Sequence, residues 1–120
     1  MSAAPEFDFE MHQGDDKHLL ISVLDEAGDA KSLAGVLSIR WWFAKKVTTA
    51  DALVEKSVGS GITIVGSSVD GVLQVDIDSE DTLSLKGNFY HELEVIDSAG
   101  DIATVLRGTM TVVRALIDNP

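Results

Sequence analysis

The sequence predicts an all-β fold, an antiparallel β-sandwich of about seven to eight strands, on three observations. Short runs of alternating apolar and polar residues recur along the chain, and turns rich in glycine and aspartate separate them. No stretch keeps a helical period of apolar residues over the ~10 residues that a helix needs. Ten glycines but only two prolines suit many short strands and tight turns.

The chain is expected to form one domain with short extensions. Residues 1–5 are predicted to be a flexible arm, 6–117 a single sandwich domain, and 118–120 a tail. With 120 residues, such a domain buries roughly two-thirds of the surface that its unfolded chain exposes.

The first two strands are predicted at 6–12 and 18–24. In the first of them Phe7, Phe9 and Met11 alternate with acidic residues, which indicates a strand with one buried face. Turns that contain glycine and aspartate follow both strands, at 13–16 and 25–29.

The heaviest apolar run, 36–44, is predicted to lie at the centre of the core. In a strand, every second residue points to the same face. The residues that share the inward face here are Leu37, Ile39, Trp41 and Phe43.

The middle of the chain is predicted to hold three shorter strands, at 53–58, 62–65 and 72–77. The segment 48–51 is polar and is expected to be an exposed loop or a single helical turn. A short helical turn is also expected where Ser79-Glu80-Asp81-Thr82 supplies capping side chains.

The last two strands are predicted to form a hairpin, 89–96 with 102–113, across the turn 97–101. The apolar run 102–117 is too long for one unbroken strand. Gly108 is therefore expected to be a β-bulge at which the inward-facing set changes phase.

Composition and charge exclude several classes of protein. The net charge of −11 argues against a nucleic-acid surface, which needs a basic patch. The chain has no cysteine, so it has neither a disulfide framework nor a thiolate ligand. The N-terminal residues lack the basic start and apolar core of a secretory signal, and the most apolar window is far shorter than the ~20 residues of a spanning helix.

No catalytic residue, metal site or cofactor is predicted. The histidines His12, His18 and His91 lie far apart in the sequence, and His91, on the apolar face of its strand, is interpreted as a packed histidine at the core edge. The acidic stretch 76–81 does not follow the EF-hand pattern, so a solvated strand end is expected there, with a weak cation site left open.

Trp42 is the clearest candidate for a functional side chain. Its neighbours Trp41 and Phe43 face the core, so Trp42 and Arg40 point to the opposite, outer face. Tryptophan and arginine dominate interface hot spots, which makes this pair a candidate interface anchor. The alternative is that the N-terminal arm or the 45–52 loop covers Trp42.

Across residues 9–113 the order and spacing of turn motifs resembles the immunoglobulin-like domains of tailed-phage virion proteins, in particular the N-terminal domain family of phage baseplate upper proteins. The matching segments are Gln13-Gly14-Asp15-Asp16, Asp25-Glu26-Ala27-Gly28-Asp29, Ser32-Leu33-Ala34-Gly35, Val54-Glu55-Lys56-Ser57, Gly61-Ile62-Thr63-Ile64, Asp81-Thr82, Gly87-Asn88-Phe89-Tyr90-His91-Glu92-Leu93, Asp97-Ser98-Ala99-Gly100-Asp101 and Gly108-Thr109-Met110-Thr111-Val112.

Two departures from that family bear on the expectation. The family often has a tyrosine where this chain has Phe89, so the hydroxyl of a tyrosine corner is missing there. In the baseplate proteins further modules follow this domain, whereas here the sequence stops at Pro120.

The resemblance implies that the sandwich is an immunoglobulin-like antiparallel β-sandwich of about seven to eight strands. It also implies a non-enzymatic structural protein of a tailed-phage or phage-derived particle. We expect a small accessory subunit, made in the cytoplasm of the host bacterium and located in the virion, as a head decoration or cement subunit, a neck component or a tail or baseplate component. Its partners would be other virion structural proteins, with the chain present as a homo-oligomer or in many copies, and without nucleic acid or membrane.

The docking elements expected for that function are the sheet edges, the arm 1–8 and the tail 115–120. Phe7 and Phe9 in the arm would suit strand addition onto a neighbouring subunit. The alternative function is a carbohydrate-binding or adhesin-type module in which Trp42 and Tyr90 are stacking platforms.

Overall fold

The computed structural model describes residues 6–25, 27–45 and 52–116, and the strands lie within these ranges. The strands are β1 (Phe9–His12), β2 (Lys17–Ser22), β3 (Ser38–Ala44), β4 (Val54–Val58), β5 (Gly61–Ile64), β6 (Val72–Ile77), β7 (Gly87–Ile96) and β8 (Ile102–Val113). A 3₁₀ turn, η1, covers Ser68–Asp70 and a helical turn, α1, covers Ser79–Thr82. The predicted arm 1–5, the segment 48–51 and the tail 118–120 lie outside the described residues.

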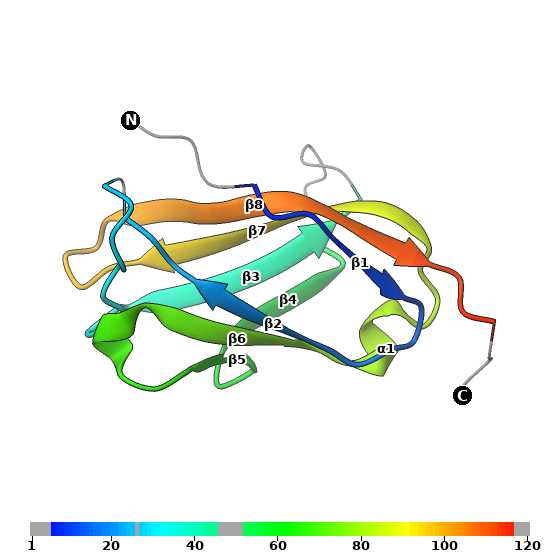
Figure 1. Cartoon of the computed structure of the whole chain (residues 1–120), viewed down its shortest axis with the longest axis horizontal. Coiled ribbons are helices and arrows are strands. Elements are labelled where there is room, and N and C mark those ends of the chain that lie inside the picture. Colours follow the sequence, from blue (N-terminus) through cyan, green and yellow to red (C-terminus); the bar gives the residue numbers. More distant parts are fainter. Residues whose placement is uncertain (1–5, 26, 46–51, 117–120) are drawn as a thin grey trace.

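The strands form the two facing layers of an immunoglobulin-like sandwich, which confirms the predicted fold class (Figure 1). The strands are hydrogen-bonded in one continuous order, β1-β8-β7-β3-β4-β5-β6-β2. One layer holds β1-β8-β7-β3-β4 and the other β5-β6-β2. Two residue pairs between β4 and β5 join the layers, and Figure 1 shows β2 crossing in front of β3 and β4. Neighbouring strands are antiparallel, except that β1 runs parallel to β8 and β4 parallel to β5.

The core lies between the two layers and is built from the inward-facing residues of every strand, as the period of two predicts. Aromatic rings pack at its centre: the ring centroids of Trp41 and Phe43 are 5.6 Å apart, and those of Phe43 and Phe89 are 5.8 Å apart. The buried apolar residues are Met11, Leu19, Ile21, Val23, Leu33, Ile39, Trp41, Phe43, Ile62, Leu73, Val75, Ile77, Phe89, Leu93, Val95, Leu106, Met110 and Val112.

The prediction that Leu37 faces the core is wrong. β3 begins at Ser38, one residue later, and the Leu37 side chain is 67% exposed. A turn before the strand, in which the Val36 N–H donates to the Leu33 carbonyl, places Leu33 in the core instead, at 1% exposure. The alternating pattern therefore starts with the strand itself and does not extend into the segment that leads to it.

The predicted bulge at Gly108 is also wrong in position. The register between β7 and β8 shifts after the pair Leu93–Leu106, because Glu94 pairs with Thr104 and leaves Val105 as the extra residue. Gly108 instead leaves room for the backbone of Phe7. A Cβ atom there would lie 2.2 Å from the carbonyl oxygen of Phe7, so the backbone of the N-terminal segment passes too close for any side chain.

Two turns with the same pattern, Asp-x-Ala-Gly-Asp, lie between β2 and β3 and between β7 and β8. In each, the first aspartate accepts the backbone N–H groups of the third and fifth residues, from Asp25 in one turn and from Asp97 in the other. The glycines, Gly28 and Gly100, have φ angles of 86° and 89°, which L side chains rarely adopt. The same side-chain chemistry thus shapes both turns, as expected for aspartate followed by glycine.

Candidate functional site

The outer face of the layer β1-β8-β7-β3-β4 contains Trp42, which points away from the core as predicted. Trp42 in β3 pairs with Glu92 of β7 on one side and with Glu55 of β4 on the other. Directly paired residues on one face of an antiparallel sheet have Cβ atoms about 4.5–5.5 Å apart. The Trp42 indole, which is partly buried, therefore lies between two carboxylate side chains. We call the outward-facing residues of these five strands the Trp42 face.

Arg40 lies on the same face and is held in place by a cross-strand partner. Arg40 pairs with Glu94 of β7, and its Nε and Nη2 both donate to Glu94 Oε1, the former at 3.2 Å. The guanidinium carbon lies 5.1 Å from the centroid of the Trp42 ring, within the range of a cation–π contact. The ion pair and the stacking together fix the arginine over one part of the indole.

Tyr90 is the third predicted interface residue on this face, and it orients a glutamate. Its hydroxyl donates to Glu92 Oε2 at 2.8 Å. Burial, followed by the hydrogen bond to Glu92 and the charge of that carboxylate, raises the pKa of Tyr90 above its ordinary value of 10.0. The phenol therefore stays protonated at neutral pH and remains a donor.

A small hollow of about 70 Å³ lies between these side chains, lined by Arg40, Trp42, Glu92 and Glu94. It combines an aromatic wall with one cation and two carboxylates. Sequence reasoning identified Arg40, Trp42 and Tyr90 but did not assign the glutamates to the site. Their outward orientation was readable from the period of two, whereas their positions beside Trp42 depend on the pairing of β3 with β7.

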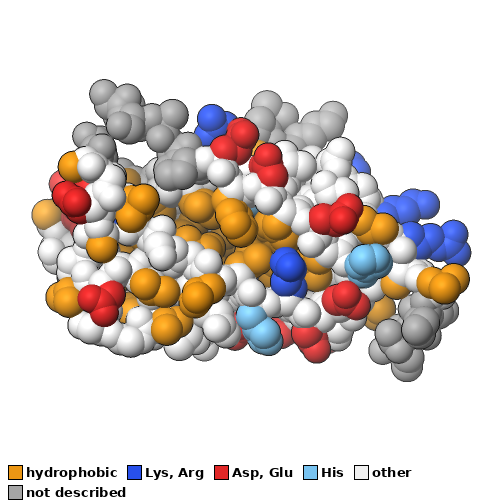
Figure 2. Space-filling view, viewed as in Figure 1, with side chains coloured by type: hydrophobic (Ala, Val, Ile, Leu, Met, Phe, Trp, Pro, Cys, Tyr) orange, Lys and Arg blue, Asp and Glu red, His pale blue; other side chains and the backbone are white. Residues whose placement is uncertain are grey.

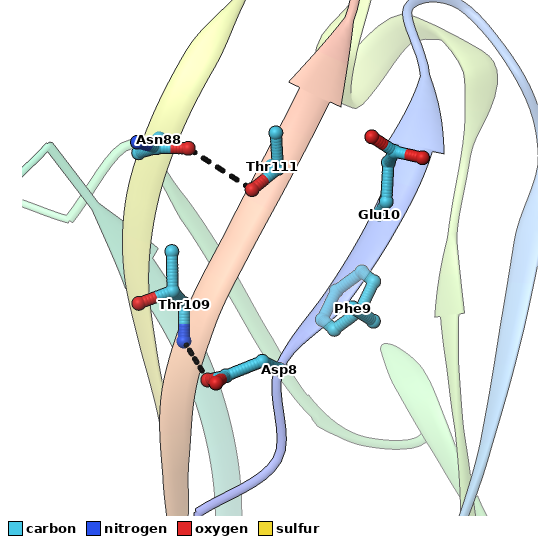
Figure 3. Close-up of a pocket in the computed structure, with 6 residues that line it drawn as sticks. All are labelled: Asp8, Phe9, Glu10, Asn88, Thr109 and Thr111. Carbon is cyan, nitrogen blue, oxygen red and sulfur yellow. Dashed lines mark hydrogen bonds between the residues drawn. The ribbon is translucent and has the colours of Figure 1, made fainter.

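The same face continues over β8 and β1, where a second and wider hollow lies (Figure 3). Figure 3 shows Asp8 directed toward Thr109, whose backbone N–H donates to the Asp8 carboxylate at 2.8 Å. The Thr111 hydroxyl donates to the Asn88 side-chain oxygen at 2.9 Å. The lining residues are Asp8, Phe9, Glu10, Asn88, Thr109 and Thr111, so two more carboxylates extend the acidic character of the Trp42 face.

Phe7 and Phe9, the predicted anchors of an arm that adds to a neighbour, pair on one side with β8 of their own chain. The Phe7 N–H donates to the Arg107 carbonyl at 2.7 Å, and Phe9 lies opposite Met110 in the parallel pair of β1 with β8. Both rings are partly buried and pack against the core. Because β1 is the terminal strand of the sheet order, β8 pairs with only one of its edges, and intersubunit strand addition at the other edge stays a prediction.

His91 is fully buried, as the interpretation of a packed histidine predicts. Its Nδ1 accepts the indole N–H of Trp41 at 3.2 Å, and its Nε2 lies 2.7 Å from the Phe7 carbonyl oxygen, to which it donates. Burial lowers the pKa of His91 below its ordinary value of 6.5, against smaller opposing effects of the Phe7 carbonyl and the Asp8 charge. The side chain is a structural link between β3, β7 and the N-terminal segment.

The aspartates of the acidic stretch 76–81 contact basic side chains of the same chain. The Lys56 ammonium lies 2.8 Å from Asp81 and 3.4 Å from Asp78, and it is largely buried. Asp76 lies 2.6 Å from a ring nitrogen of His18. Among the described residues, no group of three or more histidine, cysteine or acidic side chains is arranged to hold a metal ion.

The opposite layer has exposed apolar side chains. Figure 2 shows hydrophobic side chains gathered in the middle and toward the lower left of this face, with charged ones mostly nearer its rim. Leu20 of β2 is 64% exposed and Val69 of η1 is 57% exposed. Within residues 6–25, 27–45 and 52–116, no helix is long and apolar enough to cross a membrane.

No protein-family model and no curated protein sequence matches the chain. Among solved structures, it is similar to murine CRIg, with a TM-score of 0.46 and 9% identity over 90% of this chain and 92% of that chain. It is also similar to a structure from photo-crosslinking analyses of multimeric cell-adhesive interactions of VGSC beta subunits, with a TM-score of 0.42 and 12% identity over 99% of this chain and 98% of that chain. Likeness at these identities does not extend to partners or activity.

Proposed function

We propose that this protein is a non-enzymatic structural subunit of a tailed-phage or phage-derived particle, and that it docks on a neighbouring virion protein through the Trp42 face. The observation that supports docking is the position of Trp42 on the outer face of the sheet, with Arg40 stacked on its ring and ion-paired to Glu94. The virion assignment rests on the order of turn motifs described above. The chain would serve as a head decoration, neck, tail or baseplate component.

Docking through the Trp42 face is favoured by a small loss of conformational entropy on binding. Binding costs about 0.5–1.5 kcal/mol for each flexible side chain that becomes immobilised at the interface. Arg40 and Glu92 are already fixed, by Glu94 and by the Tyr90 hydroxyl respectively. Because Trp42 is only partly buried in the free chain, a partner can cover more of its ring and gain apolar burial.

The experiment that tests this proposal follows the chain into particles. Cells from which the gene has been deleted would be complemented with the wild type, with Trp42→Ala, or with Leu20→Ala, which alters an exposed apolar residue on the opposite layer. Particles purified by density gradient would then be assayed for the chain by mass spectrometry. We expect incorporation of the wild type and of Leu20→Ala, and loss of Trp42→Ala. Absence of the wild-type chain from particles would overturn the virion assignment.

The carbohydrate-binding or adhesin-type alternative makes a different prediction for the same face. It requires the isolated monomer to bind glycans through Trp42 and Tyr90, with binding lost in Trp42→Ala. Glycans stack on exposed ring faces, whereas here Arg40 already covers part of the indole and the Tyr90 hydroxyl is engaged by Glu92. These contacts favour the docking proposal, and a glycan-array measurement on the wild type distinguishes the two.

A further inference from the structure

We infer that the partner of the Trp42 face is a basic protein surface, and that one of its arginine or lysine side chains enters the hollow beside Trp42 and pairs with Glu92. This inference rests on the proposed docking function and names the chemistry of the partner. The juxtaposition that carries it is a partly exposed indole between two glutamates, on a face where carboxylates outnumber cations.

The charge of the face is the first argument. Outward positions on the described parts of its five strands, and on residues 6–8 that precede β1, carry six carboxylates but only two guanidinium groups. The carboxylates belong to Glu6, Asp8, Glu10, Glu55, Glu92 and Glu94, and the guanidinium groups to Arg40 and Arg107. A surface with this imbalance attracts a partner of opposite charge and repels a second copy of itself.

The state of individual carboxylates is the second argument. Glu94 is already paired with Arg40. Among the residues that the structure describes, Glu92 accepts from the Tyr90 hydroxyl and forms no ion pair, although Arg107 of β8 lies directly opposite it in the sheet. A carboxylate can accept several hydrogen bonds, so Glu92 retains capacity for a donor from a partner. Because Tyr90 also orients it, Glu92 meets that donor in a fixed geometry.

The hollow itself is the third argument. Its aromatic wall is Trp42, and the stem of an arginine or lysine side chain packs favourably on such a surface while its charged end reaches a carboxylate. A neutral polar group would gain the contact with Trp42 but not the charge-assisted hydrogen bond. An acidic group would be repelled by Glu55 and Glu92, which flank the indole.

The test uses tetra-arginine amide as the probe, tetra-citrulline amide as its uncharged counterpart, and the two indole N–H signals of the full chain in NMR spectra. The chain has two tryptophans, and the Trp41 indole is buried and donates to His91, so its signal is an internal control. We expect a saturable shift of the Trp42 signal with tetra-arginine, no shift of the Trp41 signal, and no response to tetra-citrulline.

Glu92→Gln and Glu80→Gln form the matched pair of variants. Each removes one negative charge, but Glu80 lies exposed on α1, whereas Gln at position 92 can still accept the Tyr90 hydroxyl. We expect roughly tenfold weaker binding for Glu92→Gln, the loss that corresponds to one charge-assisted hydrogen bond, and unchanged binding for Glu80→Gln. Equal weakening in both variants, or an unmoved Trp42 signal, overturns the inference.

The outcomes also separate this inference from the proposed function. If Trp42→Ala abolishes incorporation into particles while tetra-arginine leaves the Trp42 signal unmoved, docking stands and the basic partner is wrong. If tetra-arginine binds as expected but the chain is absent from particles, the virion assignment is wrong and the chemistry of the face stands. A concentration-dependent change of the Trp42 signal in the free protein would identify a second copy as the occupant and overturn the inference.

Discussion

The indole N–H of Trp41 donates a hydrogen bond to Nδ1 of His91 at 3.2 Å, between the neighbouring strands β3 and β7. In antibody domains a buried tryptophan packs against a disulfide that joins the two layers. This chain has no cysteine, and the imidazole of His91 packs beside Trp41, with ring centroids 5.7 Å apart. From its other nitrogen His91 also reaches the Phe7 carbonyl, so one side chain ties the N-terminal segment to the centre of the sheet.

Replacing His91 with leucine is expected to destabilise the fold by about 2–4 kcal/mol, because two buried polar groups lose their partners. These groups are the Trp41 indole N–H and the Phe7 carbonyl. Urea denaturation measures the change in the free energy of unfolding. His12→Leu is the control, since His12 is exposed, and it should stay within about 0.5 kcal/mol of the wild type. Equal effects of the two substitutions would contradict a structural role for His91.

The stability of the fold is expected to fall as the pH drops below about 6.5, and His91 is the cause. Its pKa is lowered in the folded state, mainly by burial, so the unfolded chain binds the proton more readily than the folded one. The stabilisation that neutral His91 contributes is therefore fully present above its pKa of 6.5 in the unfolded chain. It is lost as the pH falls from there toward the pKa of His91 in the folded state.

The measurement compares the free energy of unfolding of the wild type and of His91→Gln between about pH 5 and pH 7.5. The wild type should lose stability on acidification more steeply than the variant. The Asp76 carboxyl does not interfere, because hydrogen bonds from Gln74 and then His18 lower its pKa below 3.8, and its contribution is lost only under more acidic conditions. Parallel pH profiles for the two proteins would show that His91 does not titrate on unfolding.

Gly108→Ala is expected to displace the N-terminal segment from β8. The added Cβ would lie 2.2 Å from the Phe7 carbonyl oxygen and 2.8 Å from an Asp8 carboxylate oxygen, distances at which the backbone must move. We expect a loss of about 1–3 kcal/mol in the free energy of unfolding and faster hydrogen exchange of the Phe7 amide, which donates to the Arg107 carbonyl. Thr109→Ala, an outward substitution next to it, should change neither quantity appreciably.

The contacts of Phe7 and Asp8 affect how a deletion of residues 1–8 would be interpreted. Removing residues 1–8 would take away Phe7, which packs on the core and accepts from His91, together with the Asp8 carboxylate that accepts from Thr109. Such a deletion alters the stability of the domain as well as any assembly. A substitution on the Trp42 face is the cleaner probe of docking.

Lys56→Met is expected to cost about 1–3 kcal/mol, because the largely buried Asp81 carboxylate loses its cation. Burial alone would lower the pKa of Lys56, but the hydrogen bond and charge of Asp81, with a further effect of Asp78, hold it above the ordinary value of 10.5. The ammonium is therefore charged at neutral pH. Its pairing with Asp81 links β4 to α1 across sequence-distant segments.

A double-mutant cycle with Asp81→Asn isolates the pair. If Lys56 acts through Asp81, the double variant should be more stable than the sum of the two single losses predicts, by about 0.5–3 kcal/mol. Additive losses would instead assign the effect of Lys56→Met to the packing of the lysine stem, which lies against Gly61. Urea denaturation of the four proteins supplies both quantities.

The fold followed from the sequence because each strand alternates apolar and polar residues, and the same rule correctly placed Trp41 inside and Trp42 outside. It misplaced Leu37, where the chain has not yet become extended and Leu33 fills the core. The glutamates beside Trp42 could not be assigned from the sequence, because cross-strand register depends on tertiary packing. The role of Gly108 could not be predicted from the sequence for the same reason. The backbone that packs against this glycine is that of Phe7, 101 residues away in the sequence.

Truncation of the two adjacent tryptophans should destabilise the fold to very different extents. Trp41 is fully buried and hydrogen-bonded, so Trp41→Ala is expected to cost about 3–5 kcal/mol and to leave little folded protein. Trp42 is only partly buried and makes its described contacts on the outer face, so Trp42→Ala should cost about 1 kcal/mol or less. Thermal and urea unfolding measure both. A large loss of stability in Trp42→Ala would mean that the indole is needed for folding. The absence of the Trp42→Ala variant from particles could then no longer be attributed to lost docking.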